Sequence, residues 1–263
     1  MDGRRLGWRT AYELLALRVR RPEWAFMNYG YAPAADDDGD LALSPADEPD
    51  RLCINLYERT IDGVDLTGRD VLEVGSGRGG GSAYVARTHG PRSVVGLDFS
   101  AAAVDLSRRH RTAPGLTFVH GDAQAMPFPD ASFDAVLNVE SSHCYPSLPA
   151  FLGEVRRVLR PGGVLLLADF RPTDAVPGLL ADLRASGLTL VDHADVTPHV
   201  VAALRRDDTR KRALIGAWLP RVVHPLMRRF AAVEGSRGFA AFASGRTTYL
   251  VARLTAPTPG TAP

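Results

Sequence analysis

The chain has 263 residues, of which 45% are hydrophobic, and this is enough to bury one substantial core with a small cap. Its formal net charge of +1 argues against nucleic acid or an anionic membrane as the main partner. Its two cysteines, Cys53 and Cys144, lie far apart, which argues against a disulfide framework and a zinc cluster. No apolar run approaches the roughly 20 residues of a membrane span, and no signal peptide is recognisable. We therefore expect a cytoplasmic protein without stable membrane insertion.

Residues 1–50 are expected to form an N-terminal cap or lid. Leucines among arginines predict a helix over residues 6–20. The acidic stretch at residues 36–40 has a spacing that suits magnesium and diphosphate when it lies on a helix. The proline before this stretch and the glycine within it would interrupt such a helix. We therefore expect a solvated loop that binds no metal.

Residues 51–254 are predicted to form one domain in which strands and helices alternate. Leu52, Leu56 and Ile61 recur at helical spacing and predict a helix over residues 50–62. Strands are then expected at residues 70–74, 93–98, 116–120, 133–139 and 164–169. Helices are expected between them at residues 80–88, 101–109 and 148–159. Apolar strands that alternate with helices indicate a parallel sheet covered on both faces.

The chain beyond Pro172 is expected to complete this domain. The elements predicted there are a helix directly after Pro172, a strand at residues 188–192, a helix over residues 197–212, and a closing strand or hairpin over residues 238–254. Residues 255–263 are small and proline-rich and are predicted to form a disordered tail.

A glycine-rich turn at residues 73–80 follows the first predicted strand and opens the next helix. Its sequence, Glu-Val-Gly-Ser-Gly-Arg-Gly-Gly, fits both the dinucleotide fingerprint and the turn that binds S-adenosyl-L-methionine (SAM). Glycines let the backbone approach a ligand closely, and the start of the following helix favours negative charge. We therefore expect Gly75, Ser76, Gly77 and Gly79 to contact a nucleotide-like cofactor.

Residues around this turn favour SAM over a dinucleotide. Glu73 precedes the first glycine of the turn by two residues and is placed to accept a hydrogen bond, directly or through water, from the methionine ammonium. Asp98 stands at the end of the second predicted strand, where a carboxylate accepts hydrogen bonds from both ribose hydroxyls. We assign its neighbour Phe99 to the same cofactor site.

The third and fourth predicted strands are expected to complete the cofactor site. Asp122 would accept a hydrogen bond from the adenine amino group, Ala123 would offer apolar contact to the ring, and Asn138 is assigned to the cofactor as well. The Tyr-x-x-x-Lys pair of many dehydrogenases is missing. Lys211 is the only lysine of the chain, and Asp207 stands where the tyrosine would have to be.

From residue 71 to about residue 170 the chain resembles class I SAM-dependent methyltransferases. Within that class it is similar to phthiotriol/phenolphthiocerol dimycocerosate O-methyltransferases and related natural-product O-methyltransferases, over most of residues 26–253. The segments that carry this resemblance are residues 55–57, 71–74, 137–146, 159–163, 169–172 and 242–245. The resemblance implies a Rossmann-like, doubly wound, mostly parallel sheet of seven strands, an antiparallel C-terminal strand, and SAM as the cofactor.

The residues after the fourth predicted strand are the candidate catalytic group. Methyl transfer to an alcohol needs a base that removes the hydroxyl proton, and histidine suits this role. The Glu-Ser-x-His pattern, with Glu140 and His143, resembles that of sugar and polyketide O-methyltransferases with a catalytic histidine there. Cys144 stands where those enzymes often have a second histidine. We predict His143 as the base, Asp169 as its helper, and Glu140 as a residue that binds the substrate.

The acceptor is expected to bind between the cap and an insertion over residues 172–230. Tyr29 and Tyr31 would close over it and exclude water. The sequence then predicts O-methylation of a hydrophobic small molecule, such as a polyketide, a lipid or a glycosylated natural product. The histidines show no ligand spacing, so we expect no metal.

Several alternatives stay open at this point. They are C- or N-methylation, a cyclase of the same fold that keeps SAM as a non-reacting ligand, and a NAD-dependent oxidoreductase. The sequence also leaves open whether the protein forms a homodimer.

Overall fold

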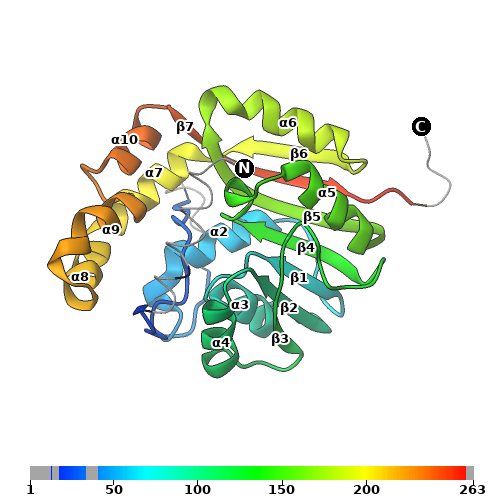
Figure 1. Cartoon of the computed structure of the whole chain (residues 1–263), viewed down its shortest axis with the longest axis horizontal. Helices are drawn as coiled ribbons and strands as arrows, with labels where there is room; N and C mark the ends of the chain where they lie inside the picture. The colour runs from blue at the N-terminus through cyan, green and yellow to red at the C-terminus, as the bar shows by residue number, and fades with distance from the viewer. Residues whose placement is uncertain (1–12, 14–17, 34–40, 259–263) are drawn as a thin grey trace.

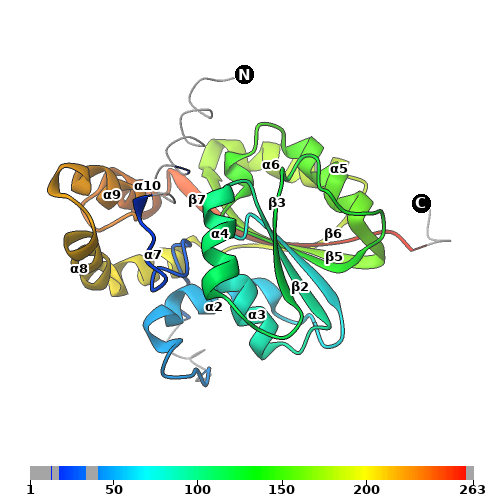
Figure 2. The same ribbon diagram turned by 60° about the horizontal axis from the view of Figure 1, so that its bottom comes forward.

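The computed structural model of the chain describes residues 13, 18–33 and 41–258. Most of the predicted helix over residues 6–20 and the whole predicted loop at residues 36–40 lie outside this part. Within it, a twisted sheet separates two layers of helices, and a further group of helices lies beyond the end of the sheet (Figures 1 and 2). No helix in the described part is long and apolar enough to cross a membrane.

In the described part of the chain, seven strands form a single sheet in the order β3-β2-β1-β4-β5-β7-β6. The strands are β1 (Asp70–Val74), β2 (Ser93–Asp98), β3 (Leu116–His120), β4 (Phe133–Val139), β5 (Leu159–Pro172), β6 (Thr189–Asp195) and β7 (Thr247–Thr255). The strands β3, β2, β1, β4 and β5 pair in parallel, whereas β7 is antiparallel to both of its neighbours. The predicted fold class, including the antiparallel C-terminal strand, is confirmed. The strand order reverses between β1 and β4, and such a switch point is where ligands of doubly wound sheets bind.

Helices cover both faces of this sheet (Figure 2). The helices are α2 (Arg51–Ile61), α3 (Gly80–Thr88), α4 (Ala101–His110), α5 (Leu148–Val158), α6 (Val176–Ala185), α7 (Thr197–Arg206), α8 (Asp208–Trp218), α9 (His224–Phe230) and α10 (Arg237–Ala243). Helices α2 and α3 lie on one face, and α5 and α6 lie on the other (Figure 2). Helices α8, α9 and α10 extend beyond the sheet (Figure 1).

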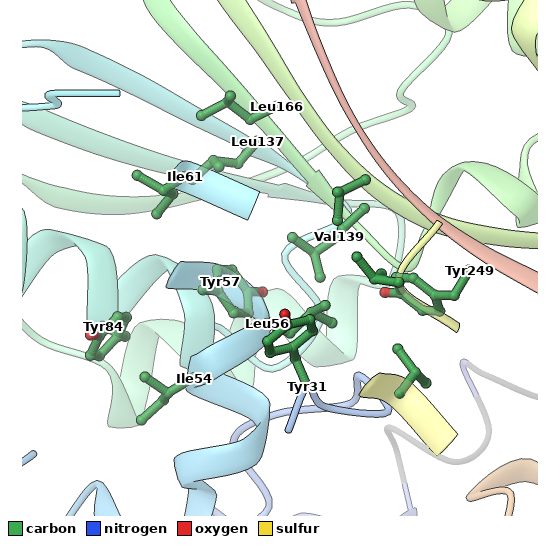
Figure 3. Packing of buried hydrophobic residues seen from close by; sticks show 14 of the residues in the cluster. Tyr31, Ile54, Leu56, Tyr57, Ile61, Tyr84, Leu137, Val139, Leu166 and Tyr249 are labelled. Carbon is green, nitrogen blue, oxygen red and sulfur yellow. The ribbon is translucent and has the colours of Figure 1, made fainter. Parts of the chain in front are cut away.

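Successive side chains of each central strand enter opposite layers of the core. In β4, Leu137 joins the cluster beneath α2 and α3, and Val136 joins the cluster beneath α5 and α6. Figure 3 shows the first cluster, where α2 contributes Tyr57 and Ile61 and β5 contributes Leu166. Burial of each such aliphatic side chain contributes about 1.5–3 kcal/mol. Both faces of the strands are therefore apolar, which is why the sequence showed continuous apolar runs.

Two C-terminal predictions are corrected by the structure. The predicted strand or hairpin over residues 238–254 begins instead with helix α10, whose start is capped by Ser236 because its Oγ accepts a hydrogen bond from Phe239 N at 3.2 Å. Phe239 and Phe242, three residues apart, are both buried by this helix. Residues 255 and 256 do not belong to the predicted tail, since Thr255 ends β7 and Ala256 is buried.

The single helix predicted over residues 197–212 is two helices. Asp207 separates α7 from α8, and its carboxylate accepts hydrogen bonds from Arg210 Nε at 2.6 Å and Nη2 at 3.0 Å. Helices α8 and α9 then pack around a small separate cluster of Ile215, Met227 and Val233. The helices beyond the sheet thus have an apolar centre of their own.

The contact between α2 and α3 makes Gly81 a sensitive position. A methyl group at Gly81 would lie 2.0 Å from Tyr57 Cζ, which is closer than atoms can approach. We expect Gly81→Ala to lower the free energy of unfolding by about 1–3 kcal/mol in urea denaturation, because Tyr57 is buried and has to shift. The control is Gly216→Ala in α8, where nothing lies within 4 Å. Equal effects of the two substitutions would contradict this packing.

Candidate active site

A cavity opens at the carboxyl ends of β1, β2 and β4, at the switch point of the sheet. The predicted site residues in its wall are Tyr29, Gly75, Ser76, Gly77, Asp98, Phe99, Asp122, Ala123, Glu140 and His143. Those outside its wall are Tyr31, Glu73, Gly79, Asn138 and Asp169. The structure therefore brings two thirds of the predicted residues to one cavity and places the rest behind it or elsewhere.

The glycine turn forms one wall of the cavity. Gly75 has a φ of 80°, and a methyl group there would lie 2.2 Å from Ser141 Oγ, so only glycine lets the loop after β4 come this close. Gly77 N donates to Asp98 Oδ2 at 2.7 Å and thereby ties the turn to the end of β2. Gly79 has a φ of 74° and packs against Phe118, so it shapes the start of α3 and stays outside the cavity wall.

Asp98 places a buried carboxylate in the cavity wall. Besides Gly77, its side chain accepts a hydrogen bond from Ser100 N at 2.8 Å. Burial raises the pKa of Asp98 to about 6, against the effect of these two hydrogen bonds. Ala123 is buried, whereas Phe99 is 46% exposed at the rim. The Asp98 carboxylate thus offers a hydrogen-bond acceptor beside the apolar surface of Ala123 and Phe99.

Glu73 lies behind the cavity and acts on it through Tyr57. Its carboxylate is 1% exposed and accepts hydrogen bonds from Tyr57 Oη at 2.5 Å and from Ser82 Oγ. Burial raises the pKa of Glu73 to about 7, although both hydrogen bonds favour the charged form. Tyr57 itself lines the cavity. The contact between Tyr57 and Glu73 is not predictable from the helical pattern, because an aromatic residue on an amphipathic helix is typical of a core position.

Asn138 holds the loop that follows β4. It is fully buried, and its Nδ2 donates to Val74 O at 2.9 Å and to Ser141 Oγ at 2.7 Å. Ser141 and Tyr145 line the cavity, and their hydroxyl oxygens lie 2.7 Å apart. Asn138 thus joins the end of β1 to this loop, although it stands outside the cavity wall.

His143 and Asp169 form a hydrogen-bonded pair. His143 Nδ1 lies 2.7 Å from Asp169 Oδ1, and His143 N donates to Asp169 Oδ2 at 2.9 Å. Asp169 is 0% exposed, whereas the side chain of His143 is 26% exposed at the cavity. The His143 ring also packs on Phe170, with ring centroids 4.3 Å apart. Because Nδ1 faces Asp169, Nε2 is the ring nitrogen that points away from that carboxylate.

The charges of this pair stabilise one another. Burial alone would lower the pKa of His143, but the charge and hydrogen bond of Asp169 outweigh it and raise the pKa to about 10. Burial alone would raise the pKa of Asp169, but His143, Arg171 and Ser142 hold it well below its usual range. Arg171 Nη1 lies 3.2 Å from Asp169 Oδ2, a contact that sequence reasoning missed.

Glu140 connects the cap to the loop after β4. It has a φ of 49°, which is rare for a residue with a side chain, and its Oε1 accepts hydrogen bonds from Tyr29 N at 2.6 Å and Tyr249 Oη at 3.1 Å. Burial raises the pKa of Glu140 to about 8. The Tyr29 ring contacts Phe170 and Phe242, with centroids 5.5 and 5.3 Å away. The cap is therefore anchored directly beside His143.

Tyr31 lies elsewhere, against the interpretation that placed it over the acceptor. Its ring is 7% exposed and stacks on His199, with centroids 4.7 Å apart. It belongs to the core beneath α2, where burial of an aromatic ring explains its position. No group of histidine, cysteine, aspartate and glutamate side chains that could hold a metal occurs among the described residues.

Comparison with known proteins identifies the family of this chain. A family model described as a methyltransferase domain matches residues 72–167. The phthiotriol/phenolphthiotriol dimycocerosates methyltransferase of Mycobacterium tuberculosis (strain ATCC 25618 / H37Rv) is 42% identical over 230 residues, which cover 88% of this chain and 84% of that protein. The chain belongs to the SAM-dependent methyltransferases. A fatty-acid O-methyltransferase of Mycolicibacterium smegmatis is 38% identical to this methyltransferase over 222 residues, 84% of this chain and 80% of that protein.

Solved structures agree with the methyltransferase fold. The [4+2]-cyclase SpnF has a TM-score of 0.64 and 23% identity, over 95% of this chain and 94% of that chain. Geranyl diphosphate C-methyltransferase from Streptomyces coelicolor A3(2), in complex with S-adenosyl-L-homocysteine, has a TM-score of 0.63 and 19% identity, over 93% and 97% of the two chains. At these identities the two structures show the fold alone.

The cavity has the chemistry that SAM requires. The Asp98 carboxylate suits ribose hydroxyls, and Ala123 and Phe99 offer apolar surface to a purine ring. Ser76 Oγ is buried in the same wall and has no hydrogen-bond partner among the described residues. A bound polar ligand would satisfy such a group. The residues present therefore fit the cofactor of this methyltransferase family.

We expect Asp98→Asn to weaken SAM binding by about tenfold or more in calorimetry, because hydrogen bonds to a charged group contribute about 1.5–3 kcal/mol. The substitution keeps the shape of the side chain and removes the charge. Asp105→Asn on α4 is the matched control, since Asp105 is exposed and its carboxylate faces Arg109 at 3.6 Å. An unchanged dissociation constant for Asp98→Asn would show that this carboxylate does not bind the cofactor.

Proposed function

We propose that this methyltransferase transfers a methyl group from SAM to a hydroxyl of a lipid-like acceptor, with His143 as the base. The observation that carries the proposal is the His143–Asp169 pair: His143 stands in the wall of the cavity, and its Nδ1 lies 2.7 Å from the Asp169 carboxylate behind that wall. One relative is named for phthiotriol dimycocerosates and another for fatty acids, which supports a hydrophobic acceptor.

Residues of the chain itself would remove the proton of the acceptor hydroxyl. SAM, when bound, supplies an electrophilic methyl group that forms a bond to the acceptor oxygen as its bond to sulfur breaks. His143 Nε2 takes the hydroxyl proton, while Nδ1 keeps its hydrogen bond to Asp169. Asp169 orients the ring and stabilises the imidazolium, and Arg171 and Ser142 hold Asp169 in place.

The cap and the insertion would bind the acceptor. We assign residues 1–50 to the cap, residues 51–254 to the methyltransferase domain, and residues 172–230 to the insertion that builds the acceptor pocket. Tyr29 would contact the acceptor, and Glu140 would hold Tyr29 in place through its backbone N–H at 2.6 Å. A cytoplasmic location and a homodimer remain predictions.

Methylation of a carboxylate is a second candidate, and the raised pKa of His143 favours it. A carboxylate needs no base, and a protonated imidazole would bind its negative charge. The relative named for fatty acids agrees with this chemistry. The products differ, because a methyl ester is hydrolysed by alkali whereas a methyl ether survives. C- or N-methylation, and a cyclase that keeps SAM intact, would form neither product.

His143→Ala should lower kcat for transfer to a hydroxyl by about 100-fold or more, because the base is lost. SAM binding should be unchanged in calorimetry. The assay follows S-adenosylhomocysteine formed from SAM with long-chain alcohols as acceptors. His193→Ala is the control, since His193 lies on β6 and is exposed. Full turnover by His143→Ala would remove His143 from the mechanism.

The pH dependence tests the state of His143. The folded-state pKa is raised to about 10, so the neutral base is scarce at pH 7 and kcat/KM for a hydroxyl should rise with pH toward that value. Asp169→Asn removes the charge that raises this pKa, so the midpoint should move to lower pH and the maximal rate should fall. Glu140 also titrates nearby, with its pKa raised to about 8, so Glu140→Gln is the control. If His143 is the titrating group, the rise of kcat/KM toward about pH 10 should persist in Glu140→Gln. A carboxylate acceptor would show the reverse, with loss of rate above about pH 10.

A further inference from the structure

A second cavity lies between the cap and the helices beyond the sheet. Its wall contains residues of the cap and of α8 and α9, including Trp24, Leu214, Trp218, Leu219 and Met227. In Figure 1 the dark blue cap segment runs beside these orange and yellow helices. The two cavities share residues of the cap and of α9, namely Phe26, Met27, Asn28, Tyr29 and Phe230. The second cavity therefore adjoins the cavity that contains His143.

Lys211 brings a buried positive charge to this cavity, whose wall also contains Glu23, Asp50 and Arg210 beside its apolar residues. Its side chain is 12% exposed, and Nζ is buried without a hydrogen-bond acceptor among the described residues. The nearest counter-charge is Asp207 Oδ2 at 3.6 Å, and the Tyr29 ring centroid lies 6.0 Å away. An ammonium group carries three protons to donate, and a buried donor without an acceptor costs free energy. A ligand oxygen in the cavity would remove this cost.

The neighbouring residue Arg210, in contrast, has hydrogen-bond acceptors for its guanidinium group. Arg210 occupies both oxygens of Asp207, and its Nη1 donates to Asp50 Oδ1 at 3.1 Å. The charges of Arg210 and Lys211 are thus balanced by Asp207 and Asp50, but the hydrogen bonds go to Arg210 alone. The Lys211 ammonium group therefore lacks a hydrogen-bond acceptor among the described residues, although its charge is already balanced by these carboxylates.

We propose that the second cavity binds the distal part of the acceptor and that Lys211 Nζ donates a hydrogen bond to a carbonyl or carboxylate oxygen there. This proposal rests on the proposed function, because it takes the acceptor hydroxyl to lie at His143. The apolar walls bind an alkyl chain, and Tyr29 and Phe230 lie where the two cavities meet. The acceptor is then a chain with a hydroxyl at one position and a carbonyl-type oxygen further along.

Acceptor discrimination tests the proposal. The probes are 1-dodecanol, 12-hydroxydodecanoic acid and the methyl ester of that acid, together with the corresponding hexadecyl and eicosyl series. Products are identified as ethers by their stability to alkali. We expect Lys211→Met to lower kcat/KM by about tenfold or more for the acid or ester whose length fits, and to leave the plain alcohol within about twofold. Lys211→Arg should retain the preference, and Arg228→Met on α9, which is exposed, is the control.

The acid and the ester separate the two sources of the oxygen. A larger loss for the acid than for the ester assigns a carboxylate, and equal losses assign a carbonyl. Equal losses for the plain alcohol and the oxygen-bearing probes would overturn the proposal and leave the proposed function intact. A Lys211→Met variant that still prefers the acid or ester over the plain alcohol would also overturn the proposal.

Intrinsic fluorescence reports binding without turnover. Trp24 and Trp218 both line the second cavity, with ring centroids 6.4 Å apart, and Trp8→Phe removes the third tryptophan of the chain. Methyl dodecanoate and its longer homologues, which have no hydroxyl to methylate, are titrated into this variant. We expect the fluorescence to change on binding, and Lys211→Met to weaken binding by about tenfold.

Such binding without any methylation of the hydroxy probes would support the subsite and contradict the proposed function. Binding unaffected by Lys211→Met would contradict the subsite.

Discussion

The buried carboxylate of Asp169 holds the active site together. It accepts hydrogen bonds from the backbone of His143 and Phe170 and from the hydroxyl of Ser142, and it pairs with the His143 ring. A fully buried carboxylate is stable only when its oxygens are paired. The loop after β4 therefore cannot move without removing hydrogen-bond donors from this buried charge. The position of the His143 ring and its raised pKa both follow from that one group.

The cap depends on the same loop. Glu140 accepts the backbone N–H of Tyr29, and the Tyr29 hydroxyl donates to Phe230 O at 3.2 Å. A single residue of the cap therefore bridges the loop after β4, the end of β5 and the insertion. This explains how two cavities come to share a wall, one beside the glycine turn and the other beside Lys211. Tyr29 thus physically links the two cavities.

Predictions from the sequence were most accurate where local pattern and burial agree. The strands β1 to β4 and helix α3 begin and end as predicted, since their apolar runs are bounded by glycines or charged residues. Helix α10 was misread as a strand, because a short apolar segment fits either structure until its neighbours are known. Glu73, Asn138 and Tyr31 were placed at the ligand, although the first two lie behind the cavity wall and Tyr31 packs in the core.

The sequence by itself determined the fold class, the cofactor and the pairing of His143 with Asp169 as neighbours at the ends of adjacent strands. Parallel strands bring their carboxyl ends to one edge, so the order of motifs along the chain predicts which residues meet there. Only the tertiary structure decided which residues line the cavity and which stand behind its wall, and it alone revealed the contacts of Tyr57, Arg171 and the buried Lys211. Those roles depend on contacts between segments far apart in the chain, and no local pattern encodes them.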